Sequence, residues 1–372
     1  MNNRDLHIVS FNVPLPANYG GVIDVYYRLR ALSEAGVQVH LHCFDYGRGE
    51  AKELEQYCVE VNYYQRDMSP LRMLDRRPFI VASRESKELK HRLMQDRYPV
   101  LLEGLHCCAL LEDEGVCRGR TVMVRAHNVE GEYYRRLAAS ERRWLKRLYL
   151  KIDAWKIARY EPILRRADAV LAVNEGEKQQ FEAMGCRNVQ SMSSCHPYDK
   201  VVAQAGTGKY ALYHGALDVA ENARAAEWLI DNVVDGLPCS LIIAGSNPPE
   251  WLQQKVDESD TVYLVDNPTD EKMRQLIAEA QVCLLVTDQP TGLKLKLLNS
   301  LFAGRHCLVN SAMVAGTSLG DLCTVADGAV ALRKELTRLM HTPFSESMLD
   351  ERRRALRPLT PSEAVKPVLD LL

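Results

Sequence analysis

The stretch "LHIVSFNVPLPANYGGVIDVYYRLRALSEAGVQVHLHCF", from Leu6 to Phe44, contains one complete structural repeat. Residues 6–13 are a short apolar run typical of a strand, and residues 22–36 carry apolar side chains at the three- and four-residue spacing of a helix. Residues 37–44 alternate between apolar and polar side chains, which predicts a second strand. A strand, a helix and a strand in this order form the β-α-β unit from which parallel sheets are built.

The same pattern continues through the rest of the chain. Strand-like runs alternate with helical or polar segments, and the alternation restarts after a polar, glycine-containing segment. The sequence therefore predicts an α/β protein made of two Rossmann-like, doubly wound parallel-sheet domains that face each other across a cleft, with ligands outside the carboxyl ends of the strands. The predicted segments are a first domain at 1–195, a linker at 196–209, a second domain at 210–358, and a C-terminal helix at 359–372 that packs back across the junction.

The composition is typical of a compact soluble protein. Of the 372 residues, 47% are apolar and 26% are charged, close to the average for globular domains. The formal net charge of −2 argues against a nucleic-acid partner, because such a partner normally requires a strong basic excess. The first residues lack the pattern of a signal peptide, and nowhere do about 18 apolar residues run together, so we expect neither secretion nor a membrane span.

The eleven cysteines are scattered and show no CxxC spacing. Reduced thiols in a cytoplasm are therefore a better interpretation than a disulfide framework. Cys195 and His196 are adjacent and both are residue types that bind metals, but two neighbouring ligands without partners are weak evidence for a site. The sequence predicts no metal and no cofactor.

A long helical stretch rich in arginine and lysine, "EYYRRLAASERRWLKRLYLKIDAWKIARYEPILRR", covers residues 132–166. Pro162 predicts a break or kink in it. Two interpretations of the charge remain open: a solvated helix face, or a surface that docks on anionic lipid headgroups or on an anionic acceptor. The expected location is the cytoplasm, with peripheral contact at the inner face of the membrane under the second interpretation.

Two candidate segments lie in the first domain. "PLPANYGG" places Gly20 and Gly21 between the first strand and the first helix, where backbone N–H groups can approach an anion or a sugar. An ordinary turn would explain the same two glycines. In "VRAHNVEGEYY", His127 closely follows a predicted strand, where an imidazole can hold or transfer a proton near neutral pH; the alternative is a structural histidine.

A third candidate segment, "LYHGALDVAENARAAEWL", opens the second domain. Gly215 ends a predicted strand, and Asp218 or Asn222 could cap the helix that follows. Free N–H groups at the start of that helix would form an anion site. Capping and ligand binding therefore both remain open for this segment.

The fourth segment is "TGLKLKLLNSLFAG", residues 291–304. A helix that starts near Gly292 would place Lys296 about one turn in, with Asn299 on the same face. Lys294 would lie nearer the helix start, where the helix dipole disfavours positive charge. A diphosphate at this end would satisfy both lysines and the free N–H groups, and two surface lysines with apolar stems are the alternative.

In this order, the four segments resemble the GT-B glycosyltransferases, and most closely family 4, the retaining enzymes that use nucleotide sugars. "PLPANYGG" resembles the first-loop Gly-Gly segment of that family, "RAHNVE" its histidine motif and "HGALDVAENARAAEWL" the opening of its donor domain. "TGLKLKLLNSLFAG" is similar to its "GxRxKxLEAxAxG" helix. The resemblance implies a GT-B enzyme that moves a hexose-type unit from a nucleotide diphosphate sugar to a polysaccharide, glycolipid or lipid-linked acceptor, with retention at the anomeric carbon.

The resemblance also implies roles for individual residues. Lys296 would contact the donor diphosphate with Lys294 beside it, and His127 would lie near the transferring sugar, so that Lys296 and His127 are the implied catalytic residues. Gly20 and Gly21 would border the diphosphate and the acceptor. The implied donor-binding residues are Gly215, Asp218, Asn222, Thr291, Gly292, Lys294, Lys296 and Asn299. Fixed positive charge would stabilise the leaving diphosphate, so no metal is implied.

One departure from the family pattern concerns the nucleotide. The helix glutamate of the family falls at Asn299, and the acidic residue often found eight positions earlier falls at Thr291. An amide offers one neutral acceptor in place of two charged oxygens, so donor affinity or nucleotide choice would differ from the family norm. Two alternatives follow: another GT-B enzyme, such as a nucleotide-sugar epimerase or hydrolase, and a non-catalytic binding subunit.

Overall fold

The chain folds into two compact units, each built around its own parallel sheet. The computed structural model describes residues 4–372 except 142, 235, 238 and 291–294. The first unit consists of residues 4–195 together with Pro361–Leu372. The second consists of His196–Pro290 and residues 295–360.

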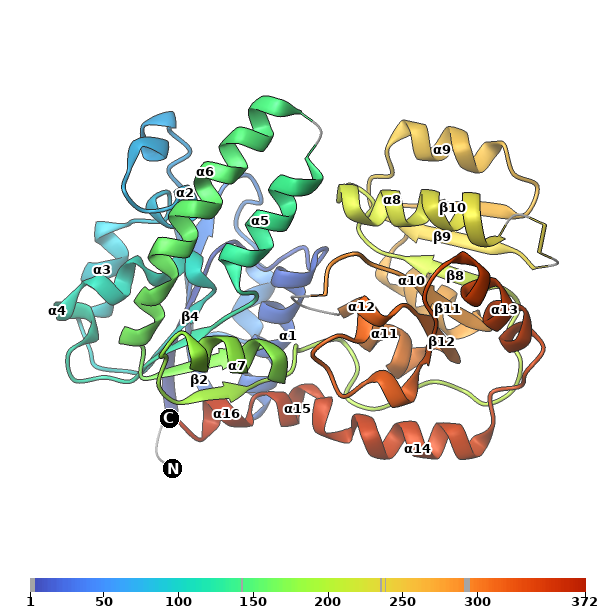
Figure 1. The fold of residues 1–372 in the computed structure, drawn as a ribbon. Coiled ribbons are helices and arrows are strands. Elements are labelled where there is room, and N and C mark those ends of the chain that lie inside the picture. The colour runs from blue at the N-terminus through green and yellow to red at the C-terminus, as the bar shows by residue number, and fades with distance from the viewer. Residues whose placement is uncertain (1–3, 142, 235, 238, 291–294) are drawn as a thin grey trace. The chain divides into compact units, whose positions relative to one another are not determined.

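The first sheet has the strand order β3-β2-β1-β4-β5-β6-β7, and all neighbouring strands are parallel. Its strands lie in the blue to green part of the ribbon in Figure 1. Its strands are β1 (Arg4–Ser10), β2 (Val37–Asp45), β3 (Glu60–Gln65), β4 (Val100–Glu103), β5 (Val122–Arg125), β6 (Ala169–Ala172) and β7 (Val189–Ser191). The order runs outward in both directions from β1 and β4. This doubly wound sheet therefore has its topological switch point between β1 and β4.

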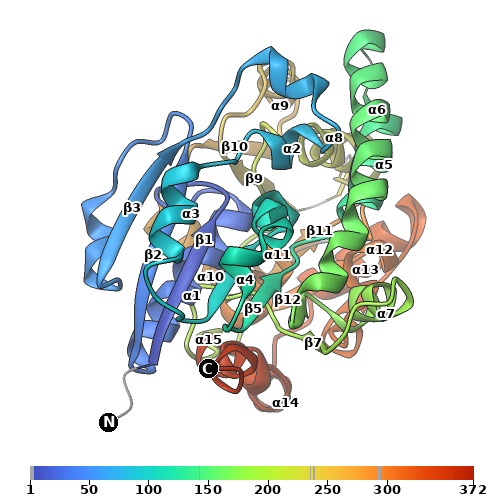
Figure 2. The same cartoon turned by 90° about the vertical axis from the view of Figure 1, so that its left-hand side faces the viewer.

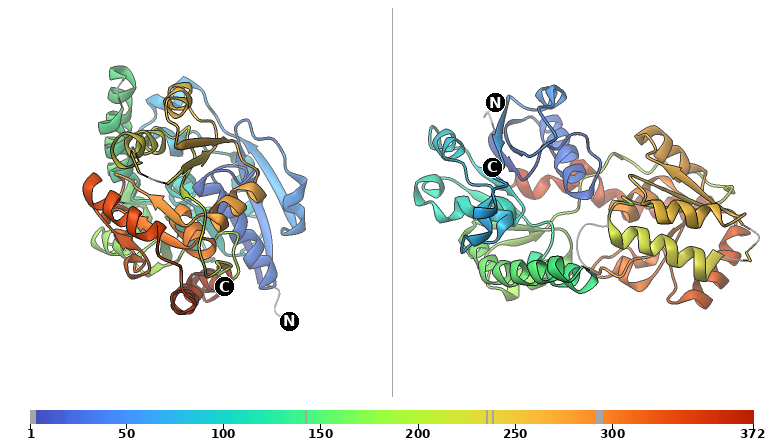
Figure 3. Two further views of the ribbon diagram at one scale, coloured as in Figure 1. Left: turned by 90° about the vertical axis from the view of Figure 1, so that its right-hand side faces the viewer. Right: turned by 90° about the horizontal axis from the view of Figure 1, so that it is seen from above.

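The second sheet repeats this plan with the order β10-β9-β8-β11-β12-β13. Its strands β8 to β12 are labelled in Figure 1, and Figure 3 gives two further views of the ribbon. Its strands are β8 (Ala211–His214), β9 (Leu241–Gly245), β10 (Val262–Asp266), β11 (Val282–Leu285), β12 (His306–Val309) and β13 (Thr324–Val325). Its switch point lies between β8 and β11. The predicted fold class, two Rossmann-like doubly wound parallel sheets, is confirmed.

The central strands are short apolar runs because helices cover both faces of a parallel sheet. β4, β5 and β6 are buried along their whole lengths, as are β8, β11 and β12. In the first unit the helices are α1 (Gly20–Glu34), α2 (Phe79–Ala82), α3 (Lys87–Leu93), α4 (Glu114–Cys117), α5 (Glu130–Ser140), α6 (Trp144–Tyr160), α7 (Glu175–Ala183), α15 (Pro361–Ala364) and α16 (Lys366–Leu369). In the second they are α8 (Ala220–Leu229), α9 (Glu250–Asp257), α10 (Asp270–Glu279), α11 (Leu295–Ala303), α12 (Ser311–Val314), α13 (Ala329–Met340) and α14 (Glu346–Leu356).

The arginine- and lysine-rich stretch forms two helices, α5 and α6, which lie side by side (Figures 1 and 2). α6 ends at Tyr160, and a 3₁₀ turn at Glu161–Arg166 contains Pro162, so the predicted break there is confirmed. The separation of α5 from α6 was not predicted from the sequence. Helical periodicity alone does not show where a helix turns back on its neighbour.

The end of the chain belongs to the core of the first unit. Val365 and Val368 are fully buried in the same apolar cluster as β1 and β4, and α15 contacts α1. The segment forms two short helices, α15 and α16, where the sequence predicted one.

Three chemical features bear on the sequence predictions. All eleven cysteines have free thiols. At Cys195 and His196, the N–H of Cys195 donates to Asp24, and Nε2 of His196 lies 3.0 Å from the carbonyl oxygen of Leu359. Within the described residues, no cluster of three or more His, Cys, Asp or Glu side chains is arranged to hold a metal. Across the same described ranges, every helix is too short or too polar to cross a membrane.

Candidate functional site

The carboxyl ends of the central strands carry polar residues in both units. Glu103 is the last residue of β4 and Arg125 the last residue of β5. In the second unit, His214 is the last residue of β8, and α11 is the next helix after β11. Open parallel sheets bind ligands at this edge, next to the switch point. Each unit therefore has its own candidate site there.

In the first unit, the loop from β1 to α1 packs against an aromatic ring. α1 begins at Gly20, and the side chain of Tyr19 before it does not cap the helix. A Cβ on Gly21 would lie 2.7 Å from Cζ of Phe11, so a residue without a side chain is needed there. The ring of Phe11 meets the imidazole of His127 edge to face, with 5.4 Å between centroids. The "PLPANYGG" and "RAHNVE" segments are thus linked through Phe11.

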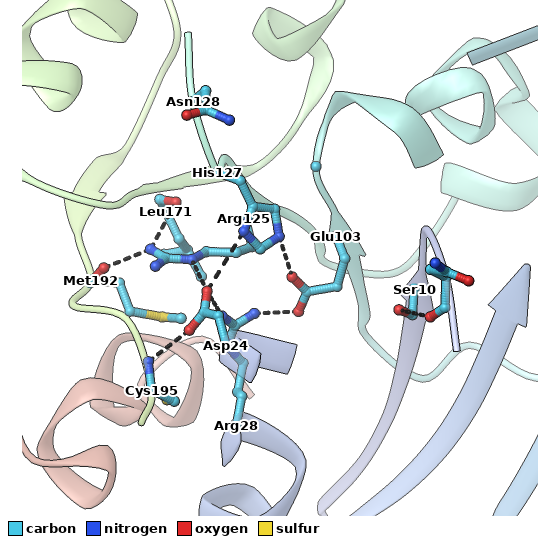
Figure 4. Close-up of polar contacts among 12 residues, drawn as sticks. Ser10, Asp24, Arg28, Glu103, Arg125, His127, Asn128, Leu171, Met192 and Cys195 are labelled. Atoms are coloured by element: carbon cyan, nitrogen blue, oxygen red, sulfur yellow. Dashed lines mark hydrogen bonds and ion pairs between the residues drawn. The ribbon is translucent and has the colours of Figure 1, made fainter. Parts of the chain in front are cut away.

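Five ionisable side chains form a buried charge cluster at this edge: Asp24 and Arg28 of α1, Glu103, Arg125 and His127 (Figure 4). Arg28 makes ion pairs with both carboxylates. Nε of Arg125 lies 3.2 Å from Oδ2 of Asp24, and Nε2 of His127 donates to Oε2 of Glu103 at 2.9 Å. Two guanidinium groups balance two carboxylates, which is the arrangement that allows charges to remain buried.

The members of this cluster set one another's protonation. Burial by itself raises the pKa of Asp24, but the guanidinium groups of Arg28 and Arg125 outweigh that effect and hold the pKa below its ordinary value. Glu103 behaves in the same way, through Arg28 and the hydrogen bond from His127. Both carboxylates are therefore ionised at neutral pH.

His127 lies inside the cluster and is only 5% exposed. Nε2 of its imidazole is held by Glu103, and Nδ1 lies 3.7 Å from Oδ2 of Asp24. The backbone follows β5 closely, as the sequence predicted, while the ring points toward the two carboxylates (Figure 4). The position of the ring is therefore fixed by buried charges.

The cluster also forms hydrogen bonds with the segment that follows β7, the last strand of the first sheet. Oδ1 of Asp24 accepts a hydrogen bond from the N–H of Cys195 at 2.6 Å, and Nη1 of Arg125 donates to the carbonyl of Met192 at 2.6 Å. Asp24 and Arg125 thereby connect α1 and β5 to the segment after β7.

In the second unit, the ends of β8 and β9 approach each other closely. A Cβ on Gly245 would lie 1.8 Å from the carbonyl oxygen of Gly215, so no side chain fits there. Asn222, on the first turn of α8, donates from Nδ2 to the carbonyl of Ala216 at 2.9 Å. A Cβ on Gly215 would lie 3.3 Å from the amide of Asn222. The turn after β8 is therefore closed by Asn222.

Lys296, near the start of α11, is held by neutral groups. Its Nζ donates to Oδ1 of Asn222 at 2.7 Å and lies 5.4 Å from the ring centroid of Tyr213. No carboxylate of the described residues lies within ion-pair distance of Nζ. Burial lowers the pKa of Lys296 to about 8, and the more distant Glu221 offsets this only in part. A half-buried ammonium without a paired carboxylate favours a bound anion.

His214 lies beside Lys296 as a neutral group. Its Nε2 is 2.8 Å from Oγ of Ser300, one turn along α11 from Lys296. Burial, together with the nearby charge of Lys296, lowers the pKa of His214 to about 3. His214 therefore fixes α11 against β8 without adding a second charge.

Two more polar side chains lie near this edge. The hydroxyl of Thr287, just after β11, donates to the carboxylate of Glu221 on α8. Oδ1 of Asn299, on α11, is buried and has no hydrogen-bond partner among the described residues. A buried acceptor normally has a partner, so a hydroxyl or N–H of a ligand would complete this group.

The structure brings together part of the predicted donor site. Gly215, Asn222 and Lys296 form one connected group, with Asn299 on the same helix as Lys296. Asp218 is exposed, and the structure gives its side chain no contact with that group. Thr291, Gly292 and Lys294 lie outside the described residues, as does the predicted helix start at Gly292.

The predicted capping of α8 is wrong. The residue before the helix is Val219, and no side chain caps it. Asn222 lies inside the first turn, where its amide bonds to the carbonyl of Ala216 and to Nζ of Lys296.

The sequence prediction missed Asp24, Arg28, Glu103 and Arg125 in the first unit and His214 in the second. For Asp24, Glu103, Arg125 and His214 a signal was present, because each is an ionisable residue in a mainly apolar run: "VIDVYY", "VLLEG", "VMVRA" and "ALYHG". Such residues are almost never fully buried unless they are paired. Arg28, in "YYRLR" close to Arg30, gave no such signal.

The fold is the GT-B fold, as comparison with solved structures shows. Sucrose-phosphate synthase from Thermosynechococcus elongatus superimposes with a TM-score of 0.65 over 99% of this chain and 95% of that one, at 15% identity. WaaG, a glycosyltransferase involved in lipopolysaccharide biosynthesis, gives 0.64 over 98% and 99%, at 15% identity. HepE of Anabaena, in complex with UDP and glucose, gives 0.63 over 100% of both chains, at 11% identity.

A relative in sequence is a Klebsiella pneumoniae protein described as an uncharacterised 44.6 kDa protein in the cps region. It is 27% identical over 338 residues, which cover 84% of this chain and 83% of the relative. No model of a protein family matches the sequence.

Proposed function

We propose that the protein is a retaining glycosyltransferase of family 4 that transfers a hexose-type sugar from a nucleotide diphosphate sugar to a carbohydrate or lipid-linked acceptor. The GT-B fold supports this, since the similar structures include glycosyltransferases and one of them holds UDP and glucose. The relative in the cps region and the lipopolysaccharide role of WaaG support an acceptor in polysaccharide or glycolipid synthesis.

The observation that carries the proposal is Lys296. Its ammonium is half-buried, is oriented by Asn222 and has no carboxylate of the described chain within ion-pair distance. In this proposal it contacts the donor diphosphate, and the unpartnered Oδ1 of Asn299 accepts a hydrogen bond from a hydroxyl of the donor. Gly215 and Asn222 shape the loop that borders the donor.

The proposed reaction has a simple balance. The acceptor hydroxyl oxygen bonds to the anomeric carbon, and the bond from that carbon to the diphosphate oxygen breaks with its electron pair going to the diphosphate. The acceptor proton passes to the leaving diphosphate on the same face, so the configuration is retained. Lys296 stabilises the charge that develops on the diphosphate, a role for which no metal is needed. His127, held by Glu103, lies near the transferring sugar in this proposal.

The first test is binding of nucleotides. A thermal-shift panel of UDP, GDP and ADP with their sugars should contain one stabilising base, because a ligand at about 100 times its Kd stabilises the folded state by about 2.7 kcal/mol. Lys296→Ala should lose that stabilisation, and Lys334→Ala, a change at an exposed lysine of α13, should keep it. No stabilisation by any of these nucleotides in the wild type would overturn the donor site.

The second test is turnover with the nucleotide sugar found in this way. Release of nucleoside diphosphate on addition of a bacterial polysaccharide or glycolipid fraction should fall about 10²–10³-fold in Lys296→Ala, the usual loss when a group that stabilises developing charge is removed. A chelator should leave the rate unchanged. Binding without turnover would indicate the non-catalytic subunit, and conversion of the nucleotide sugar alone would indicate an epimerase or hydrolase.

A further inference from the structure

The exposed face of α6 is apolar. Trp144, Leu145, Leu148, Ile152 and Trp155 are 72%, 62%, 51%, 50% and 60% exposed. Apart from the adjacent pair Trp144 and Leu145, they recur at three- and four-residue spacing, which places them on one side of the helix. The sequence left open a solvated, charged face here, yet the structure places large apolar side chains in solvent.

The opposite side of the same helix is apolar as well. Leu150, Ala154 and Ile157 are buried against the first unit. A helix that is apolar on two sides is normally covered on both. One apolar side of α6 therefore has no cover among the described residues. In Figures 1 and 2 the N-terminal half of α6 extends beyond the sheet of its unit.

A second segment extends this apolar surface. The turn Pro70–Leu74 exposes Leu71, Met73 and Leu74 to 75%, 44% and 81%. Lys156 of α6 donates from Nζ to the carbonyls of Met73 and Asp75, at 2.7 and 2.8 Å, which holds the turn beside the helix. Isolated exposed apolar residues are ordinary, but two neighbouring segments that expose eight large ones mark an interaction site. We call these eight side chains together the α6 patch.

Basic residues accompany the α6 patch. Between Arg143 and Tyr160 the sequence has six basic residues, which are Arg143, Lys146, Arg147, Lys151, Lys156 and Arg159, and a single acidic one, Asp153. Asp153 is buried and accepts a hydrogen bond from the N–H of Phe79, so it does not offset the charge at the surface. Arg143, Arg147 and Lys151 are exposed and have no ion-pair partner within the part of the chain that the structure describes.

We propose that the α6 patch docks this protein on an anionic lipid surface. Tryptophan, leucine and isoleucine side chains would enter the boundary between headgroups and acyl chains, while the arginines and lysines remain at the level of the anionic headgroups. Long basic side chains suit this position because their apolar stems lie along the membrane while the charged ends stay hydrated. A protein partner would not need an excess of basic over acidic charge, whereas an anionic bilayer does.

The test uses the full-length protein and vesicles of phosphatidylcholine with or without about one-third phosphatidylglycerol. The wild type should sediment with the anionic vesicles and not with the neutral ones, and binding should weaken as salt rises because screening shortens the reach of the charges. Tryptophan emission should shift to the blue on addition of anionic vesicles, since Trp144 and Trp155 would leave water.

Matched variants separate the patch from the rest of the surface. Trp155→Ala should reduce vesicle binding at least about fivefold, and Trp251→Ala, at a half-exposed tryptophan of α9, should not. Lys151→Gln should weaken binding to anionic vesicles about fivefold, the effect of about one charge near such a surface, while Lys334→Gln should leave it unchanged. Urea unfolding of the α6 variants should match the wild type, because these side chains are exposed.

Two results would overturn the proposal. Equal binding to neutral and anionic vesicles, or none to either, contradicts an anionic lipid partner. Dimers of the wild type in sedimentation velocity that Trp155→Ala converts to monomers, without vesicle binding, would show that the patch joins two copies of the chain. None of these measurements depends on sugar transfer, so they stand apart from the test of the proposed activity.

Discussion

Lys296 shows how burial prepares a lysine for an anion. Its pKa in the folded protein is about 8, below the 10.5 of a free side chain, because burial takes away part of the hydration of the ammonium. Below pH 8 the side chain is charged in both the folded and the unfolded chain, so the cost of burying it is present. Between pH 8 and 10.5 only the unfolded chain holds the proton, and the contribution of Lys296 to stability rises with pH.

This pKa predicts a proton uptake. A diphosphate stabilises the ammonium and raises its pKa, so at pH 9 binding should draw up to about one proton from the buffer. Calorimetry of the nucleotide in two buffers with different ionisation enthalpies measures this uptake. Lys296→Arg is the control, because a guanidinium stays charged and should remove the buffer dependence. A wild type with no buffer dependence at pH 9 would contradict a lysine contact with the diphosphate.

A second prediction compares two arginines of α1, the buried Arg28 and the more exposed Arg30, by the stability lost when each is replaced. Arg28→Met should destabilise the first unit by about 3–5 kcal/mol, because it leaves Asp24 and Glu103 buried without their shared cation. Arg30→Met removes an exposed pair with Glu34 and should cost less than about 1 kcal/mol. Urea unfolding of both variants measures the difference. Similar losses in the two would show that the buried cluster is not what stabilises this edge.

Single residues were the least predictable part of the site. Lys296 and Asn222 were singled out from the sequence because each lies near a predicted helix start. Their contact with each other was not predictable, since 73 residues separate them and only the β8–β11 pairing brings them together. The partner of Glu103 was not predictable either, because its ion pair with Arg28 joins a helix to a strand end and leaves no local pattern.

At the scale of elements, the close approach of β8 and β9 predicts that alanine is much more destabilising at Gly245 than at Gly320. Gly245→Ala should destabilise the second unit by at least about 1–3 kcal/mol, because its Cβ would overlap the carbonyl of Gly215 and force the strands apart. It should also weaken nucleotide binding, since Asn222 packs on the same turn. Gly320→Ala, where a Cβ meets nothing within 4 Å, is the matched control. Chemical unfolding measures the free energy of unfolding of each variant. Equal values for the two would contradict the predicted clash between a Cβ at position 245 and the carbonyl of Gly215.

Most helices and strands were predictable from the spacing of their apolar residues and from the glycine and proline residues between them. β1 and β2 overlap the predicted strands at residues 6–13 and 37–44. β1 was found as an apolar run, which is typical of a strand covered on both faces, and β2 was found from its alternation. β3 and β7 were missed. β3 is a half-buried edge strand with the polar sequence "EVNYYQ", so it has no apolar run. β7 has only three residues, which is too short for a repeating pattern.

For the whole molecule, buried histidines predict a loss of stability in mild acid. Burial lowers the pKa of His7, His42, His106, His214 and His306 in the folded protein. The unfolded chain therefore binds more protons as the pH falls below 6.5, and the free energy of unfolding decreases. His40 acts in the opposite direction: burial lowers its pKa, but hydrogen bonds from its ring to Asp5 and Glu60 outweigh this.

Urea titrations at pH 7.5 and 5.5 measure this effect. Each fully buried neutral histidine should contribute a loss of about 1 kcal/mol at pH 5.5. His214→Gln keeps a side-chain donor near Ser300 without a titrating group, so it should reduce the pH dependence of the second unit. Equal unfolding free energies at the two pH values would contradict the assignment of neutral buried histidines.

The placement of Pro361–Leu372 in the first unit has a consequence for the order of folding during translation. Val365 and Val368 complete an apolar cluster whose other members were synthesised before the second unit emerged from the ribosome. The first unit must therefore wait with part of its core uncovered while residues 196–360 are made. A purified chain truncated after Thr360 should be cut by protease in the first unit sooner than the full-length protein, although residues 196–360 of its second unit are all present.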